Sequence, residues 1–138
     1  MKVKERMRKA VSANENTSVF QAARIMKETC APGLCAVTQE GRLSGILTKE
    51  TLDSFVRAHD FRGDSALQFH YLSNTALKDL MTRETRSVQE EDSLSEAVRL
   101  IVETGNEFLP VLDEDGRLSG MIGANDILLA VTQGEEDL

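Results

Sequence analysis

The feature of this sequence that most constrains its fold is an internal repeat. Residues 40–52 (EGRLSGILTKETL) recur 75 positions later as residues 115–127 (DGRLSGMIGANDI), and the correspondence extends without a gap back to Ser18 and Ser93. Repetition at a fixed spacing indicates one fold unit used twice. A unit of roughly 60 residues buries only about 60% of its unfolded surface. We therefore predict that the two copies share a core within one pseudo-twofold module.

The composition is typical of a small globular protein. Hydrophobic residues make up 41% of the chain, and the longest unbroken apolar run covers only residues 127–131. A membrane-spanning helix needs roughly 20 such residues. The charged first nine residues, MKVKERMRK, lack the apolar stretch of a secretory signal. We therefore expect a soluble, cytoplasmic protein with no membrane partner.

The charge distribution argues against a nucleic-acid partner. The formal net charge is −7, from 16 basic and 23 acidic residues, whereas binding to phosphate backbones needs clustered Lys and Arg. The charge is uneven, because the first nine residues are mostly basic and the chain ends with Glu135, Glu136 and Asp137. We interpret these ends as a solvated basic arm and a solvated acidic tail.

Both copies show the same succession of predicted elements. Ser18 or Thr17, and Ser93 or Asp92, can cap a helix whose apolar residues follow at helical spacing. Two apolar runs joined by a polar, glycine-containing turn then predict a hairpin, and a second helical pattern follows it. The first helices are expected to end before Pro32 and near Gly105, after a short strand near Val11 or Val88, and the hairpin strands are expected at residues 34–38 with 43–47 and 108–112 with 118–122.

Residues 53–76 lie between the copies and lack the Gly, Ser or Pro enrichment of a flexible linker. The pattern predicts an extension of the preceding helix, a loop at residues 62–64 and a short apolar segment. We therefore expect an ordered connection.

This ordered set of features, present twice, resembles the tandem CBS domain pair, or Bateman module. It comprises an opening Met-containing turn (Met7, Met81), a Ser-initiated helix, the step from Leu109 to Pro110 and the GRLSG hairpin. The resemblance implies an α/β (α+β) fold in which two βαββα repeats pack by pseudo-twofold symmetry. We expect repeat 1 at residues 1–60, a connecting segment at 61–76, repeat 2 at 77–134 and an acidic tail at 135–138, with no attached catalytic domain.

The same resemblance implies a regulatory, non-catalytic binding module that acts in signal transduction. In many members the cleft between the repeats holds an adenosine-containing ligand such as AMP, ADP, ATP, NAD or S-adenosylmethionine, and its binding controls a partner protein. A homodimer is expected, through the exposed faces of helices that include Phe55 and Leu128, and no cofactor is required. The alternative is a ligand-free module for dimerisation and protein interaction, with degenerate nucleotide sites.

The family's ligand signature follows the second hairpin strand: Gly, two apolar residues, Thr or Ser, two variable residues and Asp. The second copy keeps the carboxylate as Asp126 but has Gly123 at the hydroxyl position, whereas the first copy keeps Thr48 but has Thr51 at the carboxylate position. A hydrogen bond to a charged group contributes about 1.5–3 kcal/mol, against about 0.5–1.5 kcal/mol for a neutral one. The site around Asp126 is therefore the better candidate for a ribose.

The resemblance also assigns roles to residues around these signatures. An apolar wall for an adenine ring would come from Phe108, Leu109, Pro110 and Val88, phosphate contacts from Arg83 and Arg86 (matched by Arg8 and Lys9 in the first copy), and a further cation from Lys49. Each polar residue also has a simpler interpretation. Asp126 would be favoured by the helix dipole alone, Thr48 could be a helix cap, and the cations could be ordinary surface charges.

No catalytic or metal motif is recognisable. His59 and His70 are the only histidines, and no Walker loop or HExxH sequence is present. The C-x4-C spacing of Cys30 and Cys35 suits neither a thioredoxin-like pair nor a zinc site, which needs four ligands. We expect both cysteines to be buried, inert thiols, and the protein not to be an enzyme.

Overall fold

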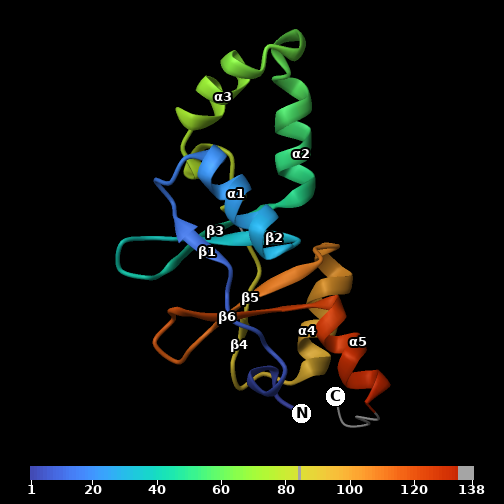
Figure 1. Ribbon diagram of the computed structural model, residues 1–138. Helices are drawn as coiled ribbons and strands as arrows, with labels where there is room; N and C mark the ends of the chain where they lie inside the picture. Colours follow the sequence, from blue (N-terminus) through green and yellow to red (C-terminus); the bar gives the residue numbers. More distant parts are fainter. Residues whose placement is uncertain (84, 134–138) are drawn as a thin grey trace. The chain divides into compact units, whose positions relative to one another are not determined.

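The computed structural model describes residues 1–83 and 85–133, so the acidic tail expected at 135–138 lies outside the described residues. The chain divides into two compact units. Unit 1 contains Met1–Ala10 together with the chain from Arg86 onward, and unit 2 contains Val11–Thr85. The first ten residues, blue in Figure 1, thus belong with the orange and red part of the chain. The units therefore do not coincide with the two sequence copies.

Each unit has the βαββα order predicted for a copy, and each contains a three-stranded sheet in which a short strand runs parallel to a hairpin strand. In both sheets the hairpin strands are antiparallel. Unit 2 contains β1 (Ser12–Asn14), α1 (Val19–Thr29), β2 (Gly33–Val37), β3 (Leu43–Thr48) and α2 (Lys49–Ala58). Unit 1 contains β4 (Val88–Gln89), α4 (Leu94–Thr104), β5 (Phe108–Leu112), β6 (Leu118–Gly123) and α5 (Ala124–Thr132).

Local sequence explains where the first helix of each unit begins and ends. The Ser18 hydroxyl accepts a hydrogen bond from the backbone N–H of Gln21 at 3.1 Å, and Ser93 does the same for Glu96 at 3.3 Å. These bonds satisfy N–H groups that have no partner within the helix. Gly105 ends α4 in the left-handed conformation, at φ +73°, and Cys30 ends α1 in the same region. The predicted caps are confirmed.

The buried hydrophobic side chains of the described residues form two main clusters, one in each unit. We predicted that the two copies share a core, and both clusters do contain residues of both copies. The opening segments of the copies, residues 1–10 and 76–85, are exchanged between the units. Val3 is fully buried in the cluster of unit 1, and Leu77 and Met81 are buried in the cluster of unit 2. Each copy therefore completes its core with the beginning of the other.

Backbone hydrogen bonds fix these exchanged segments. In unit 1 the N–H of Val3 donates to the carbonyl of Asp92 at 2.8 Å, and that of Leu94 donates to Met1 at 3.0 Å. In unit 2 the N–H of Leu77 donates to Thr17 at 2.7 Å, beside Val19 donating to Thr75 at 2.8 Å. The turns that carry the buried residues are η1 (Val3–Glu5) and η3 (Leu77–Asp79). In both units, therefore, a short turn from the other sequence copy is held by backbone hydrogen bonds at the start of the first helix.

The connecting segment is ordered but differs from the prediction in detail. Helix α2 ends at Ala58, followed by the turn η2 (Phe61–Gly63), and the predicted short apolar segment is the helix α3 (Ser65–Ser73). Aromatic rings hold α3 in place. Phe69 meets Phe20 of α1 edge to face at 4.7 Å, and Tyr71 stacks on His59 at 4.8 Å.

Candidate functional site

The junction of β6 and α5 presents the carboxylate that the sequence singled out. Asp126 lies in the first turn of α5, and its Oδ2 accepts a hydrogen bond from the backbone N–H of Gly123 at 2.8 Å. The glycine has a steric reason, because a Cβ at position 123 would lie 2.9 Å from the carbonyl oxygen of Glu107. The close backbone of Glu107 thus leaves no room at position 123 for the expected side chain with a hydroxyl. The Asp126 side chain instead caps the start of α5 through its hydrogen bond from Gly123.

The second oxygen of Asp126 binds an arginine from the other end of the chain. Its Oδ1 accepts from Nη2 of Arg8 at 2.7 Å and from Nε at 3.0 Å. Asp126 is 9% exposed, and among the described residues it is the one buried charged side chain. The Arg8 side chain remains 59% exposed. The site is therefore a buried carboxylate covered by a guanidinium that faces solvent.

The backbone of the opening segment explains how Arg8 reaches this place. Arg8 and Met121 of β6 exchange two backbone hydrogen bonds, at 2.9 and 3.0 Å, in an antiparallel bridge. The bridge requires Gly120, because a Cβ there would lie 2.8 Å from both the carbonyl oxygen of Arg8 and Sδ of Met7. The last glycine of the repeated GRLSG motif thus allows the opening segment to pack against β6.

Unit 2 has the same architecture with neutral residues at the two key positions. A Cβ at Gly45 would lie 2.6 Å from the carbonyl oxygen of Thr82, and Thr82 forms the bridge to Ile46. Thr82 is therefore the counterpart of Arg8, as Thr51 is of Asp126. Thr48 caps α2, accepting from the backbone N–H of Thr51 at 3.1 Å. The ion pair of unit 1 is thus replaced by two threonines in unit 2.

The residues assigned to an adenine wall divide between two sides of the sheet. Leu109 and Val88 belong to the hydrophobic core of unit 1. Phe108 and Pro110 alternate with Leu109 along β5, opposite Gly123 and Met121 of β6, and so point to the other face. The start of α5 adjoins that face: a Cβ at Gly123 would lie 3.8 Å from Cβ of Phe108 and 3.7 Å from Oδ2 of Asp126. The structure thus brings Phe108 together with Gly123 and Asp126.

The remaining predicted cations either have other partners or belong to unit 2. Arg86 of unit 1 forms an ion pair with Glu103 of α4 at 3.2 Å. Arg83 belongs to unit 2, where its Nη2 donates to the carbonyl of Lys78 at 3.4 Å. Lys49 is exposed at the first residue of α2, in the same unit as Thr48 and Thr51. Arg8, which the sequence comparison had only aligned with Arg83, is the cation in contact with the candidate carboxylate.

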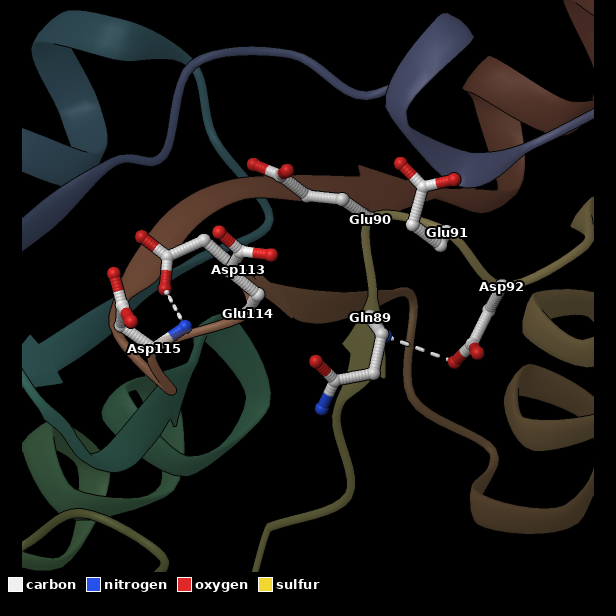
Figure 2. Close-up of a pocket in the computed structure, with 7 residues that line it drawn as sticks. All are labelled: Gln89, Glu90, Glu91, Asp92, Asp113, Glu114 and Asp115. Carbon is white, nitrogen blue, oxygen red and sulfur yellow. Dashed lines mark hydrogen bonds between the residues drawn. The ribbon is translucent and has the colours of Figure 1, made fainter.

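An acidic hollow of about 600 Å³ opens elsewhere in unit 1, lined by residues 89–92 and 113–115 (Figure 2). Most of its described carboxylates have partners: Asp92 accepts from the N–H of Gln89, and Asp113 from that of Asp115. Glu91 pairs with Lys2 and Lys4 of the opening segment, whose hydrogen bonds lower the pKa of Glu91 to about 2. Among the described residues, no group of three or more His, Cys, Asp or Glu side chains is arranged to hold a metal ion.

The two cysteines differ in environment. Cys35 is buried in β2, and desolvation raises the pKa of its thiol to about 12, so this thiol stays protonated and inert. Cys30 is exposed at the end of α1. The prediction of two buried thiols was therefore wrong for Cys30, which occupies a helix C-cap that forces it to the surface.

The chain matches a known protein family in both of its copies. Residues 3–57 and 77–133 both match the CBS domain. The chain belongs to the CBS domain family. It is 22% identical to an uncharacterized protein of Methanocaldococcus jannaschii, over 95% of this chain and 91% of that protein. It spans only 63% of an uncharacterized 17.7 kDa protein of Acidianus ambivalens. An inosine-5'-monophosphate dehydrogenase of M. jannaschii is 27% identical, but the match covers 21% of that enzyme.

Solved CBS pairs share the fold along the whole chain. CBSX2 from Arabidopsis thaliana has a TM-score of 0.83 at 24% identity, with 99% of this chain and 98% of that chain covered. CBSX2 in complex with AMP has a TM-score of 0.79 at 27% identity, with 96% of each chain covered. The CBS pair of protein MJ0100, solved with 5'-methylthioadenosine and S-adenosyl-L-methionine, has a TM-score of 0.79 at 21% identity. These likenesses establish a CBS pair of two α+β repeats.

Within the described residues, every helix is too short or too polar to cross a lipid bilayer.

Proposed function

We propose that this CBS pair is a regulatory, non-catalytic module that binds an adenosine-containing ligand at the Asp126 site and thereby controls a partner protein. The observation that carries the proposal is the buried Asp126 carboxylate at the start of α5, beside Phe108. The complex of CBSX2 with AMP, at 27% identity, supports the choice of ligand class. AMP is therefore the first ligand to test, followed by ATP, NAD and S-adenosylmethionine.

The chemistry of the site suits a ribose. A carboxylate can accept about four hydrogen bonds through its two oxygens, and a ribose offers two adjacent hydroxyl donors. The N-terminus of α5 adds backbone N–H groups and the positive end of the helix dipole, which favour a negatively charged phosphate. The side chain of Phe108 is buried, at 1% exposure, so a ring bound close to the same carboxylate would meet its apolar surface only after a local rearrangement.

Removing the carboxylate is expected to abolish most of the affinity. Calorimetric titration with AMP should give binding to the wild-type protein and a loss of about ten- to a hundredfold in Asp126→Ala, because a hydrogen bond to a charged group contributes about 1.5–3 kcal/mol. Thr51→Ala, at the equivalent position of unit 2, is the matched control and should keep the wild-type affinity. Equal affinity in the Asp126 variant would contradict the assignment of the site.

A second candidate function is that of a ligand-free dimerisation or interaction module. An exposed apolar surface on unit 1 favours it: Leu128 is 60% exposed and Val102 is 78% exposed, with Leu129 and Val131 also exposed. The equivalents of Leu128 and Val102 in the first copy are the polar Asp53 and Lys27. We propose that this surface of α4 and α5 forms the contact of a homodimer.

Light scattering after size exclusion tests the dimer. The wild-type protein should have twice the 15.2 kDa mass of one chain, and Leu128→Asp combined with Leu129→Asp should reduce it to one chain, because the added charges would have to be buried unpaired at the contact. Leu67→Asp, at another exposed apolar position on α3, should leave the dimer intact. A dimer that survives the double substitution would place the contact elsewhere.

A further inference from the structure

The ion pair between Arg8 and Asp126 occupies the oxygens that a ribose would need. Oδ1 accepts two hydrogen bonds from Arg8, and Oδ2 accepts one from Gly123. Of the roughly four acceptor positions of a carboxylate, about one is then left. A ribose that binds through both hydroxyls must therefore displace at least one N–H of Arg8.

The guanidinium of Arg8 is well placed to give way. Its side chain is 59% exposed, so the guanidinium can turn into solvent without being buried itself, and ribose hydroxyls would take its place as donors to the buried Asp126 carboxylate. Within the described residues, its Nη1 donates to no other group. The backbone of Arg8 is held by its bridge to Met121, so that the guanidinium stays within reach of whatever is bound at Asp126.

The consequences of displacement depend on the charge of the ligand. A neutral nucleoside takes the carboxylate and leaves Arg8 without a counter-ion. A ligand with a phosphate offers the guanidinium a bidentate anion in exchange, which Arg binds in a favourable geometry. A ligand with a sulfonium, such as S-adenosylmethionine, brings a second cation to the place where Arg8 already stands.

Building on the proposed function, we propose that Arg8 is the specificity-determining residue of the Asp126 site. In the free protein, Arg8 forms hydrogen bonds with the Asp126 oxygens that the ligand would use. A ligand that carries an anion displaces Arg8 from Asp126 and binds its guanidinium in turn. The site therefore selects phosphorylated nucleosides over neutral and cationic ones. Unit 2, with Thr82 and Thr51 at the equivalent positions, lacks this device. Selection by charge is therefore a property of unit 1.

Titrations of the wild-type protein and Arg8→Gln with AMP, adenosine and S-adenosylmethionine test the proposal. In the wild type, AMP should bind about ten- to a hundredfold more tightly than adenosine, as expected for one charge-assisted interaction. In Arg8→Gln, the affinity for AMP should fall and that for adenosine and S-adenosylmethionine should rise, each about tenfold. Arg8→Lys keeps the charge without the planar fork and should lie between the two.

Arg117→Gln is the matched control, because it removes the same charge from an exposed residue of the β5–β6 turn in the same unit and should leave the ratio of AMP to adenosine affinity unchanged. A ratio that is the same in the wild type and Arg8→Gln, with binding still lost in Asp126→Ala, would overturn the role of Arg8 while the proposed site stands. Failure of all three ligands to bind any variant would instead overturn the proposed function and the role of Arg8 together.

Discussion

Replacement of Gly120 by valine is expected to detach the opening segment from unit 1 and to destabilise that unit by several kcal/mol. A Cβ at this position would lie 2.8 Å from the carbonyl oxygen of Arg8, a separation that is too short for two such atoms. The oxygen cannot retreat without cost, since it accepts a hydrogen bond from the N–H of Met121 at 3.0 Å. Overpacking against the backbone belongs to the short list of changes with large effects, above about 4 kcal/mol in extreme cases.

Hydrogen exchange resolves this effect along the chain. In Gly120→Val, the amides of Val3 and Arg8 should lose protection first, because their backbone hydrogen bonds connect the opening segment to the rest of unit 1. Gly105→Ala separates sterics from backbone conformation: Gly105 of unit 1 has φ +73° with open space around it, so alanine there should cost only about 1 kcal/mol. Wild-type protection of Val3 in Gly120→Val would show that the close approach does not hold the segment.

The local elements of each unit were predictable because their signals are local. The caps at Ser18 and Ser93, the apolar spacing of the helices and the glycine-containing turns act within a few residues of where they stand. The exchange of opening segments was not predictable in this way. Val3 completes the core of unit 1 through contacts with residues more than 80 positions away, and no periodicity in residues 1–10 indicates that partner.

Of the two residues that form the ion pair of the candidate site, the sequence predicted Asp126 but not its contact with Arg8. Asp126 carries a family signature, but its partner depends on the register of the opening segment against β6. The sequence comparison aligned Arg8 with Arg83, 75 positions later, whereas the bridges and the glycine contacts pair Arg8 with Thr82, 74 positions later. The register is set by how closely the backbone approaches Gly120 and Gly45. The sequence signal for it is the pair Met7 and Met81, which are also 74 positions apart.

The exchange of segments makes the two units separately vulnerable at their opening turns. Val3→Asp is expected to unfold unit 1, because the side chain of Val3 is fully buried among apolar residues, where an unpaired carboxylate costs several kcal/mol. Small domains have only about 5–15 kcal/mol of stability in total. Lys9→Asp places the same charge at an exposed position of the same segment and should change the stability by less than about 0.5 kcal/mol.

Leu77→Asp is the companion change, since Leu77 is fully buried in the core of unit 2. Tyr71, the single tyrosine of a chain without tryptophan, lies in unit 2. Tyrosine fluorescence should therefore report unfolding at lower denaturant in Leu77→Asp than in Val3→Asp. In Val3→Asp, hydrogen exchange should accelerate first in β5 and β6. If Val3→Asp exposed β2 and β3 before β5 and β6, the opening residues would belong to the core of their own sequence copy, and the exchange would be refuted.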